Sequence, residues 1–255
     1  MNVRPAAVAG YFYPADPSGL QQQLASLMPA PETASRKPRA LIVPHAGYRY
    51  SGAIAGAAYA AMQPGDYRRV LLLGPAHRVL LRGIAVPTVS AFSTPLGTVP
   101  LATQRLQKLS SLTFVQQRDD AHAEEHALEV QLPFLQRQLG AFDLLPLVVG
   151  DCDPEQVADV IERLVDDDTL VVISTDLSHF HPQAQARGLD AETIAEIEAA
   201  VPDLQPEQAC GAMPLNGYLH YLNRQSRPVL LRAGNSGDVG GPRDRVVGYA
   251  SFRVD

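Results

Sequence analysis

The sequence predicts an α/β protein: a single-domain sandwich in which helices flank a largely parallel or mixed central sheet. Two observations carry this prediction. Short, fully apolar runs such as ALIVP and RVLLLG recur along the chain, and continuous hydrophobicity is typical of strands buried on both faces. Helical stretches such as SGAIAGAAYAAM and DPEQVADVIERLVDD separate several of these runs. This alternation of strands and helices favours a sheet covered by helices on both sides.

The elements follow from these patterns. Strands are predicted at residues 40–44, 69–74, 144–150, 170–174, 228–233 and 246–254, and helices at 51–62, 153–167 and 190–201. Leu128, Leu132, Leu135 and Leu139 mark the face of one more helix, with Asp119 and Asp120 in its first turn. Polar residues 30–38 predict a surface loop, and the turn formers of 87–100 are expected to wrap the sheet edge. The length suits one domain over residues 1–255.

Composition excludes some classes of function. The chain has 21 Lys and Arg against 27 Asp and Glu, a net charge of −6, so nothing predicts binding to nucleic acid or to an anionic membrane. Cys152 and Cys210 are its two cysteines, too few for a disulfide framework, which favours a reducing compartment. We see no signal-peptide pattern and no apolar run near the roughly 18 residues of a membrane span. A cytoplasmic protein is therefore expected.

Four of the seven histidines lie just after predicted strands. In open α/β sheets, ligands bind outside the carboxyl ends of the strands, so the loops that follow each strand are the place to look for chemistry. Such loops carry His45, His77, the group Asp176, His179 and His181, and the group Asn235, Ser236 and Asp238. Their convergence on one rim of the sheet is the main functional signal in the sequence.

Two histidines and a carboxylate form the facial triad of non-haem Fe(II) enzymes, which leaves positions for substrate and dioxygen. His45, His77 and Asp238 supply such a set. The same donors also suit zinc with a bound water, so residue types alone do not choose the metal. His126 or His179 is the candidate general acid or base beside this site.

Residues 122–126, HAEEH, match the H-x-x-E-H pattern of inverzincin proteases. A zincin motif needs both histidines on one helix face with the glutamate beside the metal-bound water. Here the motif straddles the first turns of the predicted helix, where Glu124 and Glu125 could instead be solvated first-turn acids. His126 and Glu129, three residues apart on that helix, could instead face the rim together. Zinc hydrolysis through His122 and His126 stays a minor alternative.

The motifs taken together resemble the Memo family, also called AmmeMemoRadiSam system protein B. The matching segments run in order over nearly the whole chain: RPAAVAGYFYP, PHAGYRYSG, LLGPAHR, EEHALEVQLPFL, LPLVVGD, VVISTDLSHF, CGAMP, GNSGD and VVGYAS. His122 lies outside these segments, whereas His126 and Glu129 lie within one of them.

The resemblance implies a fold similar to class III extradiol ring-cleaving dioxygenases, with a non-haem iron cleft at strand ends. By resemblance, His45 and His77 match the two metal-ligand histidines, His126 a pocket histidine, and Asp176 and His179 a D-x-x-H pocket element. In animal members a cysteine lies where this chain has Val239, which cannot bind a metal, so Asp238 is the expected substitute.

The two cysteines are not expected to be ligands. Cys210 matches a different family segment, and Cys152 is expected to be buried packing.

The leading hypothesis is therefore a metal-binding, dioxygenase-like protein that holds Fe(II), with zinc or copper as the other candidates. If it is an enzyme, it is an oxidoreductase; its expected partners are a small molecule or peptide and, by resemblance, AMMECR1-like and radical-SAM proteins. The alternative is a non-catalytic module that binds a peptide or protein in the same cleft, with Tyr48, Arg49 and Tyr50 lining the groove.

Overall fold

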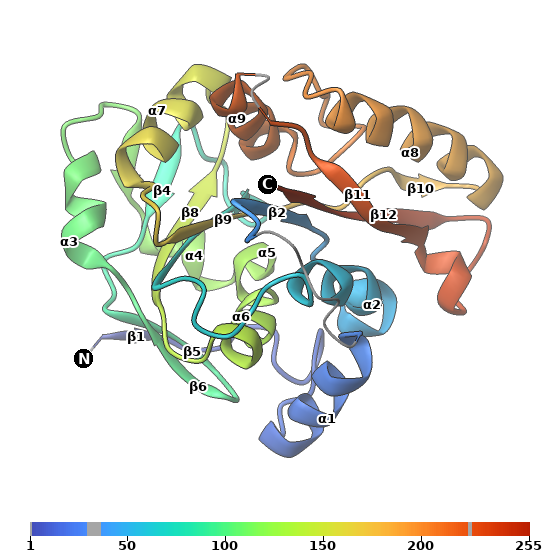
Figure 1. The fold of residues 1–255 in the computed structure, drawn as a ribbon, viewed down its shortest axis with the longest axis horizontal. Coiled ribbons are helices and arrows are strands. Elements are labelled where there is room, and N and C mark those ends of the chain that lie inside the picture. The colour runs from blue at the N-terminus through green and yellow to red at the C-terminus, as the bar shows by residue number, and fades with distance from the viewer. Residues whose placement is uncertain (1, 30–36, 224–225) are drawn as a thin grey trace.

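The computed structural model describes residues 2–29, 37–223 and 226–255. Most of the loop predicted at 30–38 lies outside these ranges. Figure 1 shows a large twisted sheet at the centre of the molecule, with helices on both of its faces. This is the mixed α/β architecture that the sequence predicts.

Within the described residues the main sheet has nine strands; its centre is parallel, and β10 pairs antiparallel with one end of β12. β2, β9, β3 and β8 lie side by side in that order, β12 and β11 continue the sheet beyond β2, and β4 and β7 continue it beyond β8. Their bounds are β2 Ala40–Val43, β3 Arg69–Pro75, β4 Ile84–Val86, β7 Val115–Gln117, β8 Asp143–Val149, β9 Thr169–Ser174, β10 His179–His181, β11 Val229–Asn235 and β12 Val246–Val254. The six predicted strands are all present.

The apolar runs of the parallel strands form the core because both of their faces are covered. Leu41, Leu71, Leu72, Val172 and Leu145 are fully buried, and each such side chain contributes roughly 1.5–3 kcal/mol when removed from water. A second, three-stranded sheet lies beside this core and consists of β1 Val3–Arg4, β5 Ala91–Thr94 and β6 Gly97–Pro100. Residues 87–100, expected to be turns at the sheet edge, therefore form a hairpin with strands of its own.

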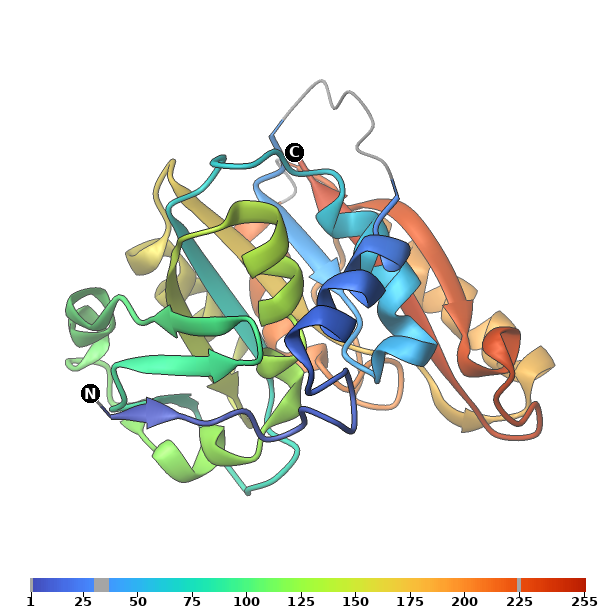
Figure 2. The ribbon, with the colours of Figure 1, turned by 90° about the horizontal axis from the view of Figure 1, so that it is seen from below.

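Helices cover the sheet in two groups. α7 and α9 pack on one face, with α8 beside them against β11 and β12, while α1, α2, α5 and α6 lie on the other (Figures 1 and 2). The helices are α1 Pro17–Leu27, α2 Tyr48–Tyr59, α3 Thr103–Leu106, α4 Asp119–Ala123, α5 His126–Glu129, α6 Leu132–Leu139, α7 Pro154–Leu164, α8 Gln183–Glu198 and α9 Ala212–Leu222, with short 3-10 turns η1 Gln107–Leu109 and η2 Ser236–Val239. In the described ranges, no helix is long and apolar enough to cross a membrane.

The segment that contains HAEEH is not one continuous helix. α4 ends at Ala123, and α5 starts anew at His126. Glu125 interrupts the helix: its backbone is extended, and its carboxylate accepts a hydrogen bond from the Ala127 N–H as the N-cap of α5. The two histidines of the H-x-x-E-H pattern therefore belong to different helices.

Candidate metal centre

Three neighbouring strands of the sheet deliver polar side chains to one rim. β9 lies between β2 and β3, and all three strands are parallel. Their carboxyl ends therefore lead into His45, Asp176 and His77 at the same edge, as the strand-end rule predicts. The His45 N–H donates to Asp176 Oδ1 at 2.7 Å, which ties the first two loops together.

A third histidine arrives from the break between α4 and α5. Gly74, in β3, lets α5 approach the strand closely: a Cβ there would lie 2.9 Å from Leu128 Cδ2 and 3.2 Å from Ala127 Cβ. Because α5 packs so closely, the His126 ring reaches the other two. The ring centroids are 5.1 Å apart for His45 and His77, 5.5 Å for His45 and His126, and 4.7 Å for His77 and His126.

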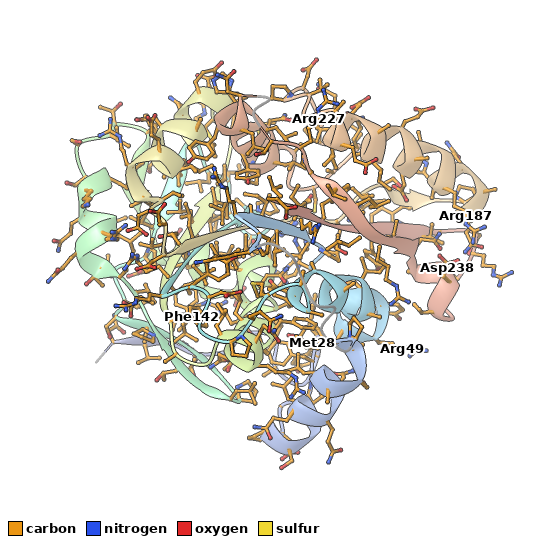
Figure 3. All side chains as sticks on the ribbon, viewed as in Figure 1. Met28, Arg49, Phe142, Arg187, Arg227 and Asp238 are labelled. Carbon is orange, nitrogen blue, oxygen red and sulfur yellow. The ribbon has the colours of Figure 1, made fainter. Side chains whose placement is uncertain are left out.

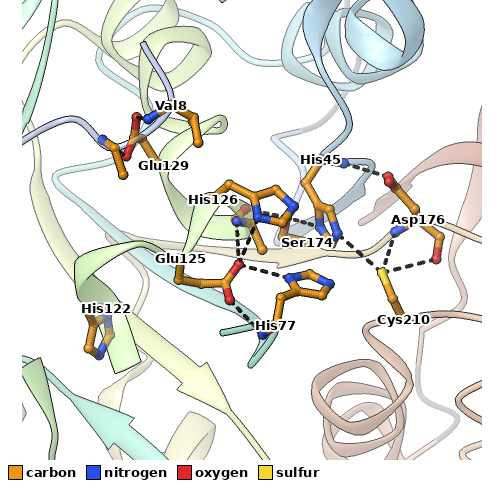
Figure 4. Close-up of polar contacts among 12 residues, drawn as sticks. Val8, His45, His77, His122, Glu125, His126, Glu129, Ser174, Asp176 and Cys210 are labelled. Carbon is orange, nitrogen blue, oxygen red and sulfur yellow. Dashed lines mark hydrogen bonds and ion pairs between the residues drawn. The ribbon is translucent and has the colours of Figure 1, made fainter. Parts of the chain in front are cut away.

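One donor atom from each of His45, His77 and His126 lies within 4.8 Å of the others, so the three could hold a metal ion (Figure 4). Neutral imidazole nitrogen is a common ligand of zinc, iron and copper. His45 is buried, whereas 27 % of the His77 side chain is exposed to solvent. The cluster is therefore enclosed on the His45 side and reachable at His77.

Glu125 fixes the orientation of His77. Its carboxylate accepts hydrogen bonds from the His77 N–H at 2.7 Å and from His77 Nδ1 at 2.9 Å. Burial opposes ionisation of Glu125, but the hydrogen bonds from His77 and Ala127 outweigh it and lower the pKa of the carboxyl to about 2. Because Nδ1–H is held by the carboxylate, the Nε2 lone pair of His77 is left free, as in the carboxylate–histidine pairs of metal sites.

Ser174 fixes the orientation of the His45 ring. The Ser174 hydroxyl donates to Ala127 O at 2.6 Å and accepts from Gln131 Nε2 at 2.8 Å. Because the Ser174 hydroxyl donates its single proton to Ala127 O, its oxygen must accept from His45 Nδ1–H, which lies 2.9 Å away. His45 therefore also carries its proton on Nδ1 and keeps the Nε2 lone pair.

The His126 ring is held by packing more than by hydrogen bonds. It contacts the Phe12 ring, with centroids 4.9 Å apart. Its Nδ1 lies 3.4 Å from Glu125 Oε1 but, among the described residues, has no hydrogen-bond partner. A buried polar atom left unpaired in this way fits a site that a further group completes.

Burial keeps the His45 and His126 rings neutral. It is the largest cause that lowers the pKa of His45 to about 3, followed by the nearby His77, and it likewise lowers the pKa of His126 to about 4, followed by His45. Neutral rings are the state that binds a metal. The donor set, its tautomers and its charge therefore fit a divalent cation.

Two further polar groups border the cluster. Asp176 is buried, and burial raises the pKa of its carboxyl. The Cys210 sulfur lies 3.2 Å from His45 Nε2, and burial raises the pKa of its thiol to about 12. His179, in β10, is partly buried and follows Asp176 by three residues.

Asp238, expected as the third ligand, is not brought to the cluster. β11 lies beyond β12 at the edge of the sheet, so η2, which follows it, is separated from His45 and His77. Asp238 accepts instead from Asn235 N at 3.0 Å, Gln183 Nε2 at 2.9 Å and Arg187 Nη2 at 2.8 Å. Figure 3 shows Asp238 beside Arg187 at the far end of the molecule. Val239, its neighbour, is 44 % exposed.

The remaining residues of the HAEEH region are structural. His122 is buried, with its Nε2 3.1 Å from Ala85 O, and does not join the three-histidine set. Glu129, expected to face the rim with His126, is fully buried on another side, where Arg4, Ala7, Val8 and Tyr13 bond to its carboxylate. Together these contacts remove the geometry on which the protease reading depends.

Tyr48, proposed to line a groove, packs in the core and donates to Val130 O at 2.7 Å. Arg49 and Tyr50 are exposed beside it, with the Arg49 guanidinium 5.6 Å from the Tyr50 ring centre.

Sequence reasoning missed Glu125, Ser174 and Cys210 as members of the site. Ser174 is the last residue of a predicted strand. The strand-end rule would have identified it if the rule had included the last residue of each strand as well as the loop that follows. Glu125 is adjacent to His126 but resembles a surface acid, and Cys210 is distant in sequence from every histidine of the cluster. Only the fold brings these two residues to the site.

The fold and the cluster define a mixed α/β protein with a three-histidine site at the carboxyl ends of parallel strands. A family model described as "Memo-like protein" matches residues 4–253. The chain therefore belongs to the Memo family. It is 35% identical to a MEMO1 family protein of Aquifex aeolicus and 35% identical to one of Methanopyrus kandleri, in each case over 98% of both chains.

The fold is also similar to the crystal structure of an uncharacterized protein from Escherichia coli K12. The TM-score is 0.53 and the sequence identity 13%, over 86% of this chain and 100% of the other. At this identity the likeness concerns the fold alone.

Proposed function

We propose that this protein is a metal-dependent, dioxygenase-like oxidoreductase whose ion is held by His45, His77 and His126, with Fe(II) as the expected metal. The observation that carries the proposal is the set of three imidazoles whose donor atoms lie within 4.8 Å of one another. Three histidines suit Fe(II), zinc or copper, so a metal-binding experiment must identify the ion that the site holds.

The protein's own groups supply the positioning. Glu125 and Ser174 hold Nδ1 of His77 and of His45, which leaves the Nε2 lone pair of each ring available to a metal ion. A bound Fe(II) would offer open positions at which a substrate and dioxygen meet. The exposed side of His77 is the direction from which a substrate enters.

Asp176 and His179 are the groups proposed to move a proton. The raised pKa of Asp176 favours the protonated carboxyl, which can donate, and a histidine nearby can accept or relay. Asp176 is also bonded to the backbone of His45, so it has a positioning role as well.

The substrate is proposed to be a small molecule or a peptide segment. Action together with AMMECR1-like and radical-SAM proteins, and a cytoplasmic location, also belong to the proposal, because they rest on the family alone.

The test is metal stoichiometry. Wild type and the variants His45→Ala and His77→Ala are loaded without oxygen with Fe(II), Zn(II) or Cu(II), desalted and analysed by mass spectrometry for bound metal. We expect about one ion per wild-type chain and strong loss in both variants. His220→Ala is the matched control, since His220 is a surface histidine with 44 % of its side chain exposed. Unchanged stoichiometry in both site variants would overturn the proposal.

A further inference from the structure

A cavity lies at the end of the sheet opposite to the histidine cluster. It has a volume of about 550 Å³ and is lined by residues that precede or begin the parallel strands, together with the end of α9. β9 shows the separation: Thr169, its first residue, lines the cavity, whereas Ser174, its last, holds His45. At about 3.3 Å per residue, these two ends lie roughly 16–17 Å apart. The cavity has the size of a small-molecule pocket and is separate from the metal site.

Tyr218 distinguishes this cavity from a gap in the packing. It lines the cavity and is 1 % exposed. Among the described residues its hydroxyl donates to no acceptor, and burial is the largest cause that raises its pKa. Four other buried tyrosines donate their hydroxyl to the protein: Tyr13 to Glu129, Tyr48 to Val130, Tyr59 to Gln131 and Tyr67 to Pro38. Because a buried tyrosine hydroxyl ordinarily has a partner, the exception points to an acceptor that a ligand brings.

Positive charge gathers in the wall of the cavity. Lys37 and Arg39 line it, and both are exposed to solvent. The Lys37 ammonium lies 4.1 Å from the centre of the Tyr67 ring and donates to Asp167 O at 3.2 Å, which fixes its place in the wall. An ammonium has three N–H donors, so Lys37 can still donate to a ligand.

The acids of the lining do not reverse this charge. The Asp166 carboxylate accepts hydrogen bonds from the Arg69 guanidinium at 2.8 Å and from the Arg105 guanidinium, so two cations already neutralise it. Asp167 is the remaining acid of the described lining, against two cations. Much of the rest is aromatic or aliphatic, including Tyr221, Val171 and Leu222. An anionic group with an apolar body matches both parts of this surface.

We propose that this cavity binds a small organic anion, a carboxylate or a phosphate ester with an aromatic or apolar body. Its oxygens accept from the Tyr218 hydroxyl and face the Lys37 and Arg39 cations, and its body packs on the Tyr67 and Tyr221 rings. The described lining has no histidine or cysteine, so the cavity is a binding site and not a second reaction centre. This inference goes beyond the proposed metal function and does not depend on it.

The unpaired hydroxyl is tested first without any ligand. Tyr218→Phe removes a group that has no partner among the described residues, so its unfolding midpoint in urea should equal or exceed that of wild type. Tyr48→Phe is the matched control, because it leaves Val130 O without its donor, and its midpoint should fall. If the midpoint of Tyr218→Phe falls as far as that of Tyr48→Phe, the hydroxyl has a protein partner and the proposal is wrong.

Benzoate, phenyl phosphate and the neutral benzamide test the charge of the ligand. Each is titrated at low salt into isotope-labelled wild type, and the amide chemical shifts are followed by NMR. We expect benzoate or phenyl phosphate to shift the amides of Thr169 and Tyr218, and benzamide to bind at least about tenfold more weakly, since charged acceptors make the stronger hydrogen bonds. The tighter of the two anions distinguishes a carboxylate from a phosphate site. No shift with either anion, or equal binding of benzamide, overturns the proposal.

Two variants with matched controls locate the anion. Lys37→Gln and Tyr218→Phe should each lower the affinity for the tighter anion about tenfold. Lys108→Gln and Tyr11→Phe, at exposed positions outside the cavity, should leave it unchanged. Equal affinities in all four variants would place the anion elsewhere and contradict the proposal. His45→Ala, which is expected to lose its metal, should bind the anion as wild type does, so either proposal can fail while the other stands.

Discussion

Glu125 and Glu129 lie four residues apart, both are buried, and each is the centre of a polar cluster with a different character. Around Glu129, the carboxylate bonds to the Arg4 guanidinium, the Tyr13 hydroxyl and the N–H groups of Ala7 and Val8. This cluster is saturated: charge is paired with charge, and the N-terminal segment is fastened to the body of the protein. Such an arrangement has a structural role.

Around Glu125, not every polar atom has a hydrogen-bond partner among the described residues. The carboxylate holds His77, but in the described part of the chain His126 Nδ1 has no hydrogen-bond partner, the Nε2 lone pair of His77 is left free, and the Cys210 thiol contacts His45. Buried polar atoms without partners cost free energy, so their retention points to a group that completes them. For these two clusters, saturation of the carboxylate's surroundings separates the cluster that fastens the N-terminal segment from the one whose histidine donors gather within 4.8 Å.

The largest effect is expected where the saturated cluster is broken. Arg4→Ala leaves the Glu129 carboxylate buried without its cation and should lower the free energy of unfolding by about 3–5 kcal/mol. Arg68→Ala is the control, because Arg68 is 82 % exposed in its ion pair with Asp168 and such a pair contributes less than about 1 kcal/mol. Urea unfolding measures both. An Arg4→Ala variant as stable as wild type would show that the Glu129 cluster does not stabilise the fold.

The next effect concerns pH and His122, whose carbonyl accepts a hydrogen bond from the Arg4 guanidinium of the Glu129 cluster. Burial lowers the pKa of His122 from 6.5 to about 4. The unfolded chain takes up a proton at His122 near pH 6.5, whereas the folded protein does so only near pH 4. The free energy of unfolding therefore carries no cost from His122 above pH 6.5 and falls as the pH drops toward 4. From pH 7 to pH 4.5 the loss amounts to about 2–3 kcal/mol.

His122→Phe removes the titrating ring, so its stability should fall less steeply between these pH values than that of wild type. Urea unfolding at pH 7, 5.5 and 4.5 compares the two proteins. Parallel profiles would show that His122 is not held neutral by burial.

A smaller effect is expected from the open cluster. Glu125→Gln keeps the shape but removes the anionic acceptor of His77 Nδ1–H. We expect metal affinity to fall about 10–100-fold, or roughly 1.4–2.7 kcal/mol, as for other carboxylates that orient metal-bound histidines. Glu124→Gln, which changes the exposed neighbour, should leave affinity unchanged. Equal affinities for Zn(II) in both variants, measured by competition with a chelator, would contradict the role of Glu125.

The strands were predictable because their signal is local. Fully apolar runs such as 170–174 encode a buried strand whatever lies around them, and the strand-end rule then places His45, His77 and Asp176 on one rim. The same rule misplaced Asp238, since β11 also ends after an apolar run but occupies the sheet edge beyond β12. A local sequence pattern does not predict strand order, because the order depends on pairing between segments that are distant in the sequence.

The HAEEH segment shows the second limit. Its apolar spacing predicts one helix, yet Glu125 caps a new helix at His126 because its carboxylate bonds to both Ala127 and His77. The contact with His77 is 48 residues distant in sequence, so propensity alone cannot reveal the break. Cys210 is a further case, since it reaches His45 across 165 residues.

The measurement that tests the account most directly compares His126→Ala with Asp238→Ala after loading without oxygen, by bound metal per chain. The account predicts that His126→Ala loses most of its metal, because it removes one of three clustered donors, and that Asp238→Ala retains the wild-type amount. Retention of metal in His126→Ala together with loss in Asp238→Ala would contradict the three-histidine centre.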